Sequence, residues 1–208
     1  MIPHRVPFFI PWLYPSLVWR MPSRANDLYL TFDDGPIPGP TEFVLDVLAK
    51  NNVKATFFCI GDNVRKHPAV FDRVVAEGHA VGNHTFNHLS GWSTTDSKYL
   101  ENIQLFESSL GNKIKSSHLF RPPYGRIKRT QIKALPHFKI IMWDVLSFDF
   151  NKNISPEKCL RNTIAATRAG SIIVFHDSLK AERNMSYAFP RFVDHFLDRG
   201  YEFKLLSQ

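Results

Sequence analysis

Two adjacent carboxylates, Asp33 and Asp34, follow an apolar segment of the sequence and are its first chemical signal. The preceding residues 28–32 have the character of a strand, and Gly35-Pro36 would end it. Neighbouring like charges at a strand end are costly unless a cation or hydrogen bonds compensate them. The stretch is therefore either a simple turn or a site at which the two carboxylates have different roles.

A pair of histidines, His84 and His88, is spaced four residues apart. On a helical turn such side chains share a face and lie near enough to bind one metal ion. Asp34 would complete a set of two His and one Asp, which leaves room for water and substrate and is typical of a catalytic metal. Asp33 would then stay off the metal and act as a base toward the water that attacks a carbonyl group.

Ionisable residues also follow other predicted strands. Arg121 comes after a strand that ends at Phe120, and His176 comes after residues 171–175. His176 suits the acid that protonates a leaving nitrogen, and Arg121 suits a cation that holds Asp33 ionised. Further acids occupy similar positions: Asp144, Asp149 and Asp177. Each short motif alone is equally compatible with a turn or a loop, so their shared position carries the argument.

The elements that must position these residues alternate along the chain. Predicted strands are 28–32, 54–60, 79–82, a short strand ending at 120, 138–143, 171–175 and 201–206. Predicted helices begin at Thr41, at Pro68 before Gly78, near 97–110 and near 128–135, run from Ser155 to Gly170, and include 189–197. The alternation predicts a parallel sheet with helices outside it, as an open doubly wound sheet or a barrel. In both, chemistry is expected at the carboxyl ends of the strands.

The composition is that of one globular domain. The chain has 208 residues with 44% hydrophobic content, and its two cysteines, Cys59 and Cys159, are expected to be buried free thiols. The net charge of +7 favours anionic partners, through either a diffuse basic surface or a dedicated anion site. We expect no nucleic-acid binding, because no basic stripe alternates with exposed aromatic residues.

The first 27 residues form a separate aromatic and proline-rich segment ahead of a single domain at 28–208. Residues 7–19 are apolar, but prolines at 7, 11 and 15 break any helix, and the stretch is too short to span a bilayer. No Ala-x-Ala-type site follows, so no cleavable signal peptide is expected, and the localisation stays open between cytoplasmic and envelope-associated. The segment is predicted either to pack on the domain or to form a peripheral membrane contact through 7–19.

Five short motifs occur in order between residues 31 and 176: Thr31-Phe32-Asp33-Asp34-Gly35, His84-Thr85-Phe86-Asn87-His88, Arg121-Pro122-Pro123-Tyr124-Gly125, Asp149-Phe150 and Val174-Phe175-His176. In this combination the chain resembles the polysaccharide deacetylases of carbohydrate esterase family four, the NodB homology domain. The family's fourth motif usually ends in Asp-Trp, and its fifth usually has Leu where Val174 stands. The acetyl or sugar pocket is therefore expected to differ.

The resemblance implies an α/β fold, a distorted (β/α)7 barrel like a TIM barrel that lacks one unit. It implies a divalent metal, usually zinc, with cobalt, nickel or manganese as alternatives. It also implies a hydrolase that removes an acetyl group from an N-acetylated sugar in a polysaccharide, oligosaccharide or glycolipid. The family's roles would fall on these residues: Asp33 as base, His176 as acid, Asp34, His84 and His88 as metal ligands, and Arg121 as the cation that orients Asp33.

Two further roles follow from the resemblance. Asp149 is expected to brace Arg121 or to tune the site, and the backbone N–H of Tyr124 is expected to stabilise the oxyanion. The candidate substrate-binding residues are Pro123, Tyr124 and Trp143. Two other functions stay open, namely a metal amidohydrolase that acts on a non-sugar amide and a non-catalytic glycan-binding domain.

Overall fold

A computed structural model describes residues 4–22, 25–111 and 118–206. The strands are β1 (Asp27–Asp33), β2 (Thr56–Cys59), β3 (Ala80–Asn83), β4 (Leu119–Phe120), β5 (Lys139–Ile140), β6 (Val145–Leu146), β7 (Ile172–His176) and β8 (Glu202–Phe203). The helices are α1 (Ile10–Leu13), α2 (Pro40–Lys50), α3 (Gly61–Lys66), α4 (Pro68–Ala76), α5 (Asp96–Ser109), α6 (Arg129–Lys133), α7 (Pro156–Ala166) and α8 (Glu182–Leu197), with one 3-10 turn, η1 (Pro123–Gly125).

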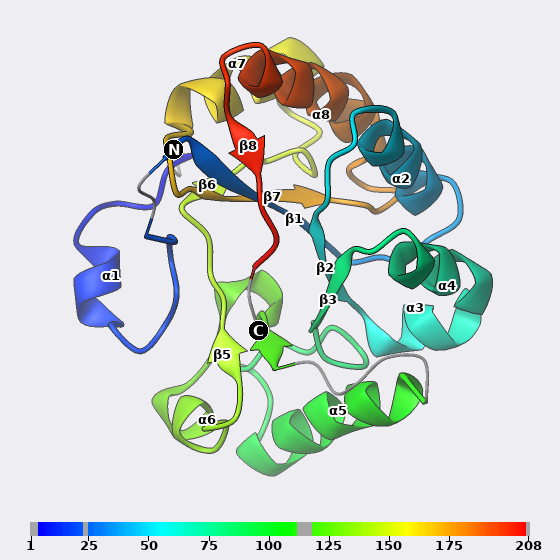
Figure 1. Cartoon of the computed structure of the whole chain (residues 1–208). Helices are drawn as coiled ribbons and strands as arrows, with labels where there is room; N and C mark the ends of the chain where they lie inside the picture. Colours follow the sequence, from blue (N-terminus) through cyan, green and yellow to red (C-terminus); the bar gives the residue numbers. More distant parts are fainter. Residues whose placement is uncertain (1–3, 23–24, 112–117, 207–208) are drawn as a thin grey trace.

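The strands form one curled parallel sheet with helices around its outside (Figure 1). Their order is β5-β4-β3-β2-β1-β7-β6, and β8 pairs with β1. β1 lies inside the sheet, between β2 and β7, and is buried along nearly its whole length, as expected for a parallel strand covered on both faces. The path from β5 to β6 is open among the described residues, which gives the distorted (β/α)7 barrel that the family resemblance implied. The alternation of elements alone had left a doubly wound sheet equally possible.

Most predicted elements are confirmed, and the differences have local causes. The strand expected at 138–143 is only Lys139–Ile140 long, and the chain beyond it makes an isolated bridge from Ile141 to Val18 of the N-terminal segment. β6, α1 and α3 were not predicted, and α8 begins at Glu182, seven positions before Phe189, the first residue of the expected helical stretch. The first turns of α8 contain few large apolar residues, so the sequence there lacks the apolar periodicity that marks a helix. The expectation that prolines exclude any helix from residues 7–19 is wrong, because Pro11 fits the first turn of α1, where its missing N–H costs no helical hydrogen bond.

The N-terminal segment lies along both open edges of the sheet. Beside β5, the backbone N–H of Val18 donates to Ile140 at 2.9 Å, and Met142 donates back to Val18 at 2.7 Å. Beside β6, Leu146 donates to His4 at 2.8 Å. These bonds satisfy edge groups that would otherwise be exposed. Within the described ranges, none of the helices combines the length and the apolar character needed to span a bilayer.

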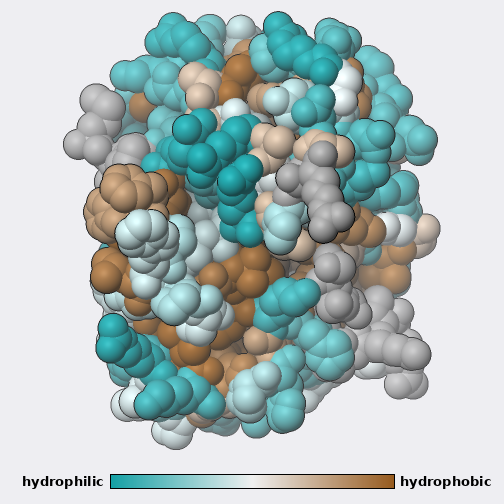
Figure 2. Space-filling model, turned by 60° about the vertical axis from the view of Figure 1, so that its left-hand side comes forward, coloured by the Kyte–Doolittle hydropathy of each residue, from teal (hydrophilic) through white to brown (hydrophobic). Residues whose placement is uncertain are grey.

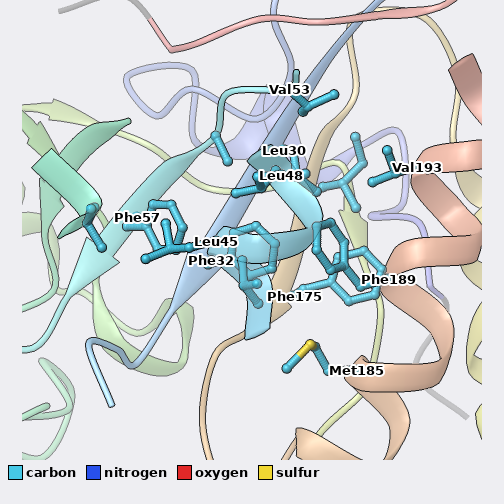
Figure 3. Packing of buried hydrophobic residues seen from close by; sticks show 14 of the residues in the cluster. Leu30, Phe32, Leu45, Leu48, Val53, Phe57, Phe175, Met185, Phe189 and Val193 are labelled. Carbon is cyan, nitrogen blue, oxygen red and sulfur yellow. The ribbon is translucent and has the colours of Figure 1, made fainter. Parts of the chain in front are cut away.

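The main core lies between the sheet and its outer helices, and aromatic rings dominate it (Figure 3). Phe32 of β1 stacks on Phe57 of β2 with ring centroids 5.2 Å apart. Phe189 of α8 meets Phe32 edge-on at 5.0 Å and contacts Phe175 of β7. Cys59 and Cys159 are buried free thiols, as expected. This core fixes β1 and β7 relative to each other, so it also fixes the residues at their ends.

We expect Phe189→Ala to lower the free energy of unfolding by about 3–5 kcal/mol, because it leaves a cavity against Phe32 and Phe175. Urea denaturation followed by circular dichroism measures this change. The matched control is Phe8→Ala, which truncates a side chain that is 77% exposed and should cost less than about 0.5 kcal/mol. Equal losses in both variants would contradict the assignment of Phe189 to the core.

Candidate active site

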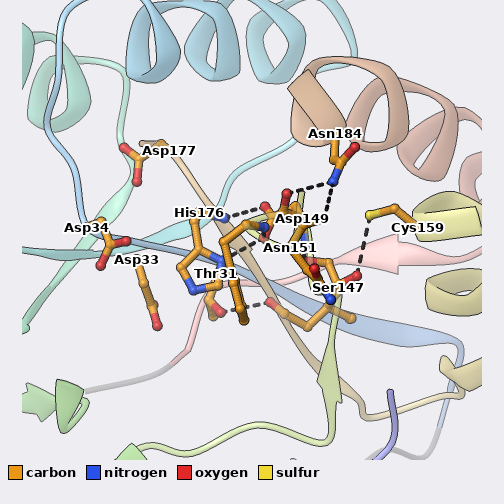
Figure 4. Close-up of polar contacts among 12 residues, drawn as sticks. Thr31, Asp33, Asp34, Ser147, Asp149, Asn151, Cys159, His176, Asp177 and Asn184 are labelled. Carbon is orange, nitrogen blue, oxygen red and sulfur yellow. Dashed lines mark hydrogen bonds and ion pairs between the residues drawn. The ribbon is translucent and has the colours of Figure 1, made fainter. Parts of the chain in front are cut away.

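The predicted functional residues meet at the carboxyl-terminal edge of the sheet. In the β1–β7 ladder, Asp33 is the register partner of His176. His84 directly follows β3, and Arg121 directly follows β4. Figure 4 shows Asp33, Asp34 and His176 together where β1 and β7 end. The prediction that these strand ends share one rim is confirmed.

Asp34, His84 and His88 form a cluster that could hold a metal ion. One ligand atom from each lies within 4.8 Å of the others. The Oδ1 atom of Asp34 is 3.3 Å from Nε2 of His88 and 3.8 Å from Nε2 of His84. The expectation that a helical turn brings the histidines together is wrong: Thr85 and His88 have φ values of 61° and 56°, and the segment is an irregular loop. The loop turns both rings toward Asp34 instead.

The electrostatic state of this cluster suits a cation. Burial lowers the pKa of His84 to about 4, so its ring is neutral near pH 7. Its Nδ1 lies 2.7 Å from the carbonyl oxygen of Arg121, which can only accept, so Nδ1 carries the proton and Nε2 presents a lone pair. Burial by itself would raise the pKa of Asp34, but the hydrogen bond from His88 and the nearby histidine charges outweigh it and hold that pKa far below its usual value.

Arg121 is fully buried and makes an ion pair with Asp33. Its Nη1 atom donates to Oδ1 of Asp33 at 2.7 Å and to the hydroxyl of Thr31 at the same distance. Nε and Nη2 donate to the carbonyls of Ile141 and Met142 at 3.2 and 2.8 Å. The guanidinium also lies 4.1 Å above the ring of Phe58. These contacts fix the orientation of the Asp33 carboxylate.

Asp149 contacts His176 and not Arg121, so of the two roles expected for it, bracing Arg121 is wrong and tuning the site fits the contacts. Its Oδ1 lies 2.8 Å from Nδ1 of His176, and its Oδ2 accepts the backbone N–H of His176 at 2.7 Å. Asn184 of α8 in turn donates to the Asp149 carbonyl at 2.9 Å. Burial alone would lower the pKa of His176, but the charge and hydrogen bond of Asp149 reverse this and raise it to about 9. His176 is therefore a cation near neutral pH.

Asp177 shapes the turn that carries Asp34. Its carboxylate accepts the backbone N–H of Gly35 at 3.0 Å and the Thr41 hydroxyl at 2.6 Å. Burial raises the pKa of Asp177 to about 8. A Cβ atom at Gly35 would lie 1.9 Å from the Asp177 carboxylate, so only glycine fits this position. Asn63 of α3, which the sequence did not single out, donates to the Asp34 carbonyl at 2.7 Å.

The site opens into a cleft of about 680 Å³. Tyr124 and Trp143 line it, as expected, and the Tyr124 hydroxyl lies 3.1 Å from Nδ1 of His88. Pro122 lines the cleft, whereas Pro123 is buried behind it. The departures from the family motifs, Phe150 and Val174, also form part of the wall.

One wall of the cleft comes from the N-terminal segment, which carried no motif. The contributing side chains are Val6, Pro7, Ile10 and Trp19. No signal in the sequence could have found them, because the contact depends on how the segment folds across the edges of the sheet. Asp144 lies outside the cleft lining and is held by Arg168 at 3.3 Å and Ser171 at 2.6 Å.

The fold and the site define an α/β-barrel hydrolase, and comparisons with known proteins name its family. The family described as polysaccharide deacetylase matches residues 20–141. Over 196 residues the chain is 31% identical to a peptidoglycan-N-acetylglucosamine deacetylase of Bacillus cereus, with 92% of each chain covered. Over 215 residues it is 33% identical to a chitooligosaccharide deacetylase of Sinorhizobium fredii, which covers 94% of this chain and 97% of that protein.

A solved structure gives the same result. A crystal structure of a peptidoglycan N-acetylglucosamine deacetylase superimposes with a TM-score of 0.88 at 30% identity, over 97% of this chain and 95% of that one. The chain belongs to the polysaccharide deacetylase family of carbohydrate esterases.

We expect Gly35→Ala to lower the free energy of unfolding by about 1–3 kcal/mol, because its methyl group would overlap the carboxylate of Asp177. Asp177→Ala alone should also destabilise the protein, because it removes two hydrogen-bond acceptors from the turn. The double variant should lose less than the sum of the two single variants, since the overlap is then absent. Urea denaturation of all four proteins measures the coupling, and strict additivity would contradict it.

Proposed function

We propose that this protein is a zinc-dependent deacetylase of N-acetylated sugars in an oligosaccharide, polysaccharide or glycolipid. One observation carries the proposal: a cluster of one carboxylate and two imidazoles shares a cleft with a separately held carboxylate, Asp33, and a cationic histidine, His176. The relatives support the sugar substrate, since they are named peptidoglycan and chitooligosaccharide deacetylases.

The donor set of Asp34, His84 and His88 fits zinc. Two imidazole nitrogens and one carboxylate oxygen are common zinc ligands, and three protein ligands leave a position for water or substrate. The neutral state of His84 and the ionised state of Asp34 mean that neither proton must be displaced on binding. A divalent cation held there would polarise the amide carbonyl and lower the pKa of a water molecule.

Asp33 is the proposed general base. Its ion pair with Arg121 occupies one carboxylate oxygen, Oδ1, and fixes the orientation of the side chain, which lines the cleft. In this role it accepts a proton from the water that attacks the acetyl carbonyl carbon. Arg121 acts on the reaction only through Asp33, because it is completely buried and does not line the cleft.

His176 is the proposed general acid. It is protonated at neutral pH, and its Nδ1–H donates to Asp149, so Nε2–H is the group available to the substrate. It can transfer that proton to the sugar nitrogen as the carbon–nitrogen bond breaks, which releases acetate and a free amine. Phe150 packs edge-on against the imidazole with centroids 5.0 Å apart and limits its rotation.

The oxyanion of the tetrahedral intermediate needs donors that already point into the cleft. Tyr124 has a φ of 60°, and among the described residues its backbone N–H has no acceptor, so this group is the proposed protein donor. The exposed Tyr124 ring and Trp143 would provide apolar faces for a sugar ring.

Two alternatives remain distinguishable. An amidohydrolase acting on a non-sugar amide would use the same groups. The apolar side chains of the cleft wall would also suit such a substrate. A non-catalytic glycan-binding domain is less well supported, because the ligand, base and acid candidates are all in position.

We expect the purified protein with zinc to release acetate from chitooligosaccharides or peptidoglycan, and a chelator to abolish the release. Cobalt or zinc should restore it. Acetate release from a panel that includes lipid-linked N-acetylated sugars and simple N-acetyl amines identifies the substrate class. Turnover in fully metal-free protein would contradict the metal mechanism, and turnover of the simple amides alone would favour the non-sugar alternative.

Two matched variants separate the adjacent acids. Asp33→Asn should reduce kcat about 100-fold to 10,000-fold and leave the zinc content unchanged. Asp34→Asn should instead weaken zinc binding, measured by metal analysis after dialysis. The opposite pattern would show that the two roles are exchanged.

The pH dependence should depend on Asp149. Because the folded-state pKa of His176 is raised to about 9, its acid form is present below that pH and is lost as the pH rises through it. The alkaline limb of the kcat profile should therefore lie near pH 9 in the wild type. Asp149→Asn removes the charge that raises this pKa, so the limb should move to lower pH. An unchanged limb would mean that another group is the acid.

A further inference from the structure

The N-terminal segment exposes a cluster of large apolar side chains that the proposed reaction does not use. This cluster, called here the aromatic tip, consists of Phe8, Phe9, Trp12, Leu13 and Tyr14. Phe8 and Trp12 are 77% and 79% exposed, and their rings meet edge-on with centroids 6.2 Å apart. Single exposed apolar residues are ordinary, but a contiguous group of this kind marks an interaction surface.

The aromatic tip is held in place by the chain around it. The backbone N–H groups of Ile10 and Tyr14 donate to Pro7 and Ile10 at 3.0 and 3.3 Å, which closes the short helix α1. The indole N–H of Trp19 donates to the Tyr14 carbonyl at 3.2 Å. With both flanks bonded to the edges of the sheet, little conformational entropy remains to be lost when the tip binds a partner.

Cations border the aromatic tip. A hollow of about 590 Å³ lies beside it, with Phe8 and Pro11 among its lining residues. Three basic side chains also line this hollow: Arg20, Lys139 and Arg168. The one carboxylate in the lining, Asp144, is buried and paired with Arg168, so it balances one of the three positive charges and the lining keeps an excess of positive charge. Figure 2 shows this side of the molecule, where hydrophobic surface is bordered by hydrophilic side chains.

We propose that the aromatic tip docks on an anionic lipid bilayer, with the neighbouring basic side chains contacting phosphate headgroups. Tryptophan, tyrosine and phenylalanine favour the boundary between headgroups and acyl chains, and basic residues beside them are attracted to anionic lipid. The net charge of +7 acts in the same direction. A second copy of this chain fits less well, because the basic side chains would face one another across a symmetric contact.

Docking would place the cleft at the lipid surface. Pro7 and Ile10 line the cleft, while their neighbours Phe8 and Phe9 are exposed, so α1 separates the active site from the docking surface by only its own thickness. If the proposed deacetylation holds, the substrate class that fits this arrangement is an acetylated sugar carried on a lipid. This last step rests on the proposed function, whereas the docking does not.

The test uses the full chain and sedimentation with vesicles of phosphatidylcholine that contain phosphatidylglycerol. The wild type should cosediment, more weakly when phosphatidylglycerol is omitted or salt is raised. The double variant Phe8→Ser/Trp12→Ser should bind roughly tenfold more weakly or worse, since it lacks the two aromatic rings that the bilayer would bury on docking. Leu105→Ser, which alters a 43% exposed apolar side chain on α5, should bind like the wild type.

Acetate release from soluble chitooligosaccharide separates the two proposals. The double variant should retain it, because neither side chain lines the cleft. Failure of the wild type to release acetate, with vesicle binding intact, would overturn only the proposed function. Docking is overturned if the wild type does not cosediment, if the double variant binds as well as the wild type, or if sedimentation equilibrium shows a dimer that the double variant abolishes.

Discussion

The buried ion pair between Arg121 and Asp33 is the constraint on which the rest of the site depends. A guanidinium with no exposed surface is tolerated only if its donors find acceptors, and here they bond to β1 and to the chain after β5. The β5 end of the sheet must therefore curl toward β1. The same bonds fix the oxygens of Asp33, so the packing requirement of one cation positions a carboxylate for chemistry.

A division of charge follows from this pair. Asp33 is neutralised by a permanent cation, whereas Asp34 faces two imidazoles from the loop that follows β3. His176, across the β1–β7 ladder, is made cationic by Asp149. Each acid thus has its own partner, which compensates the adjacent like charges. The two histidines have opposite protonation states because burial lowers the pKa of His84, whereas the Asp149 carboxylate outweighs burial and raises the pKa of His176.

The N-terminal segment connects three levels of the structure. Its backbone satisfies the edge groups beside β5 and β6, its inner side chains form a wall of the cleft, and its outer side chains form the aromatic tip. An aromatic and proline-rich sequence suits this position, because the prolines limit helical structure to the short α1 and the aromatic rings supply surface on both sides. The shape of the cleft and the identity of the exposed surface are therefore coupled through α1.

The sequence by itself determined the alternating strands and helices, the parallel sheet and the gathering of Asp33, Asp34, His84, Arg121 and His176 at one rim. Those features follow from local periodicity and from the rule that parallel strands end at the same edge. Only the tertiary structure decided that Asp149 contacts His176 and that an irregular loop rather than a helical turn joins His84 to His88. It also decided that four side chains of the N-terminal segment line the cleft: Val6, Pro7, Ile10 and Trp19. These depend on contacts between residues far apart in the chain, which leave no periodic trace in the sequence.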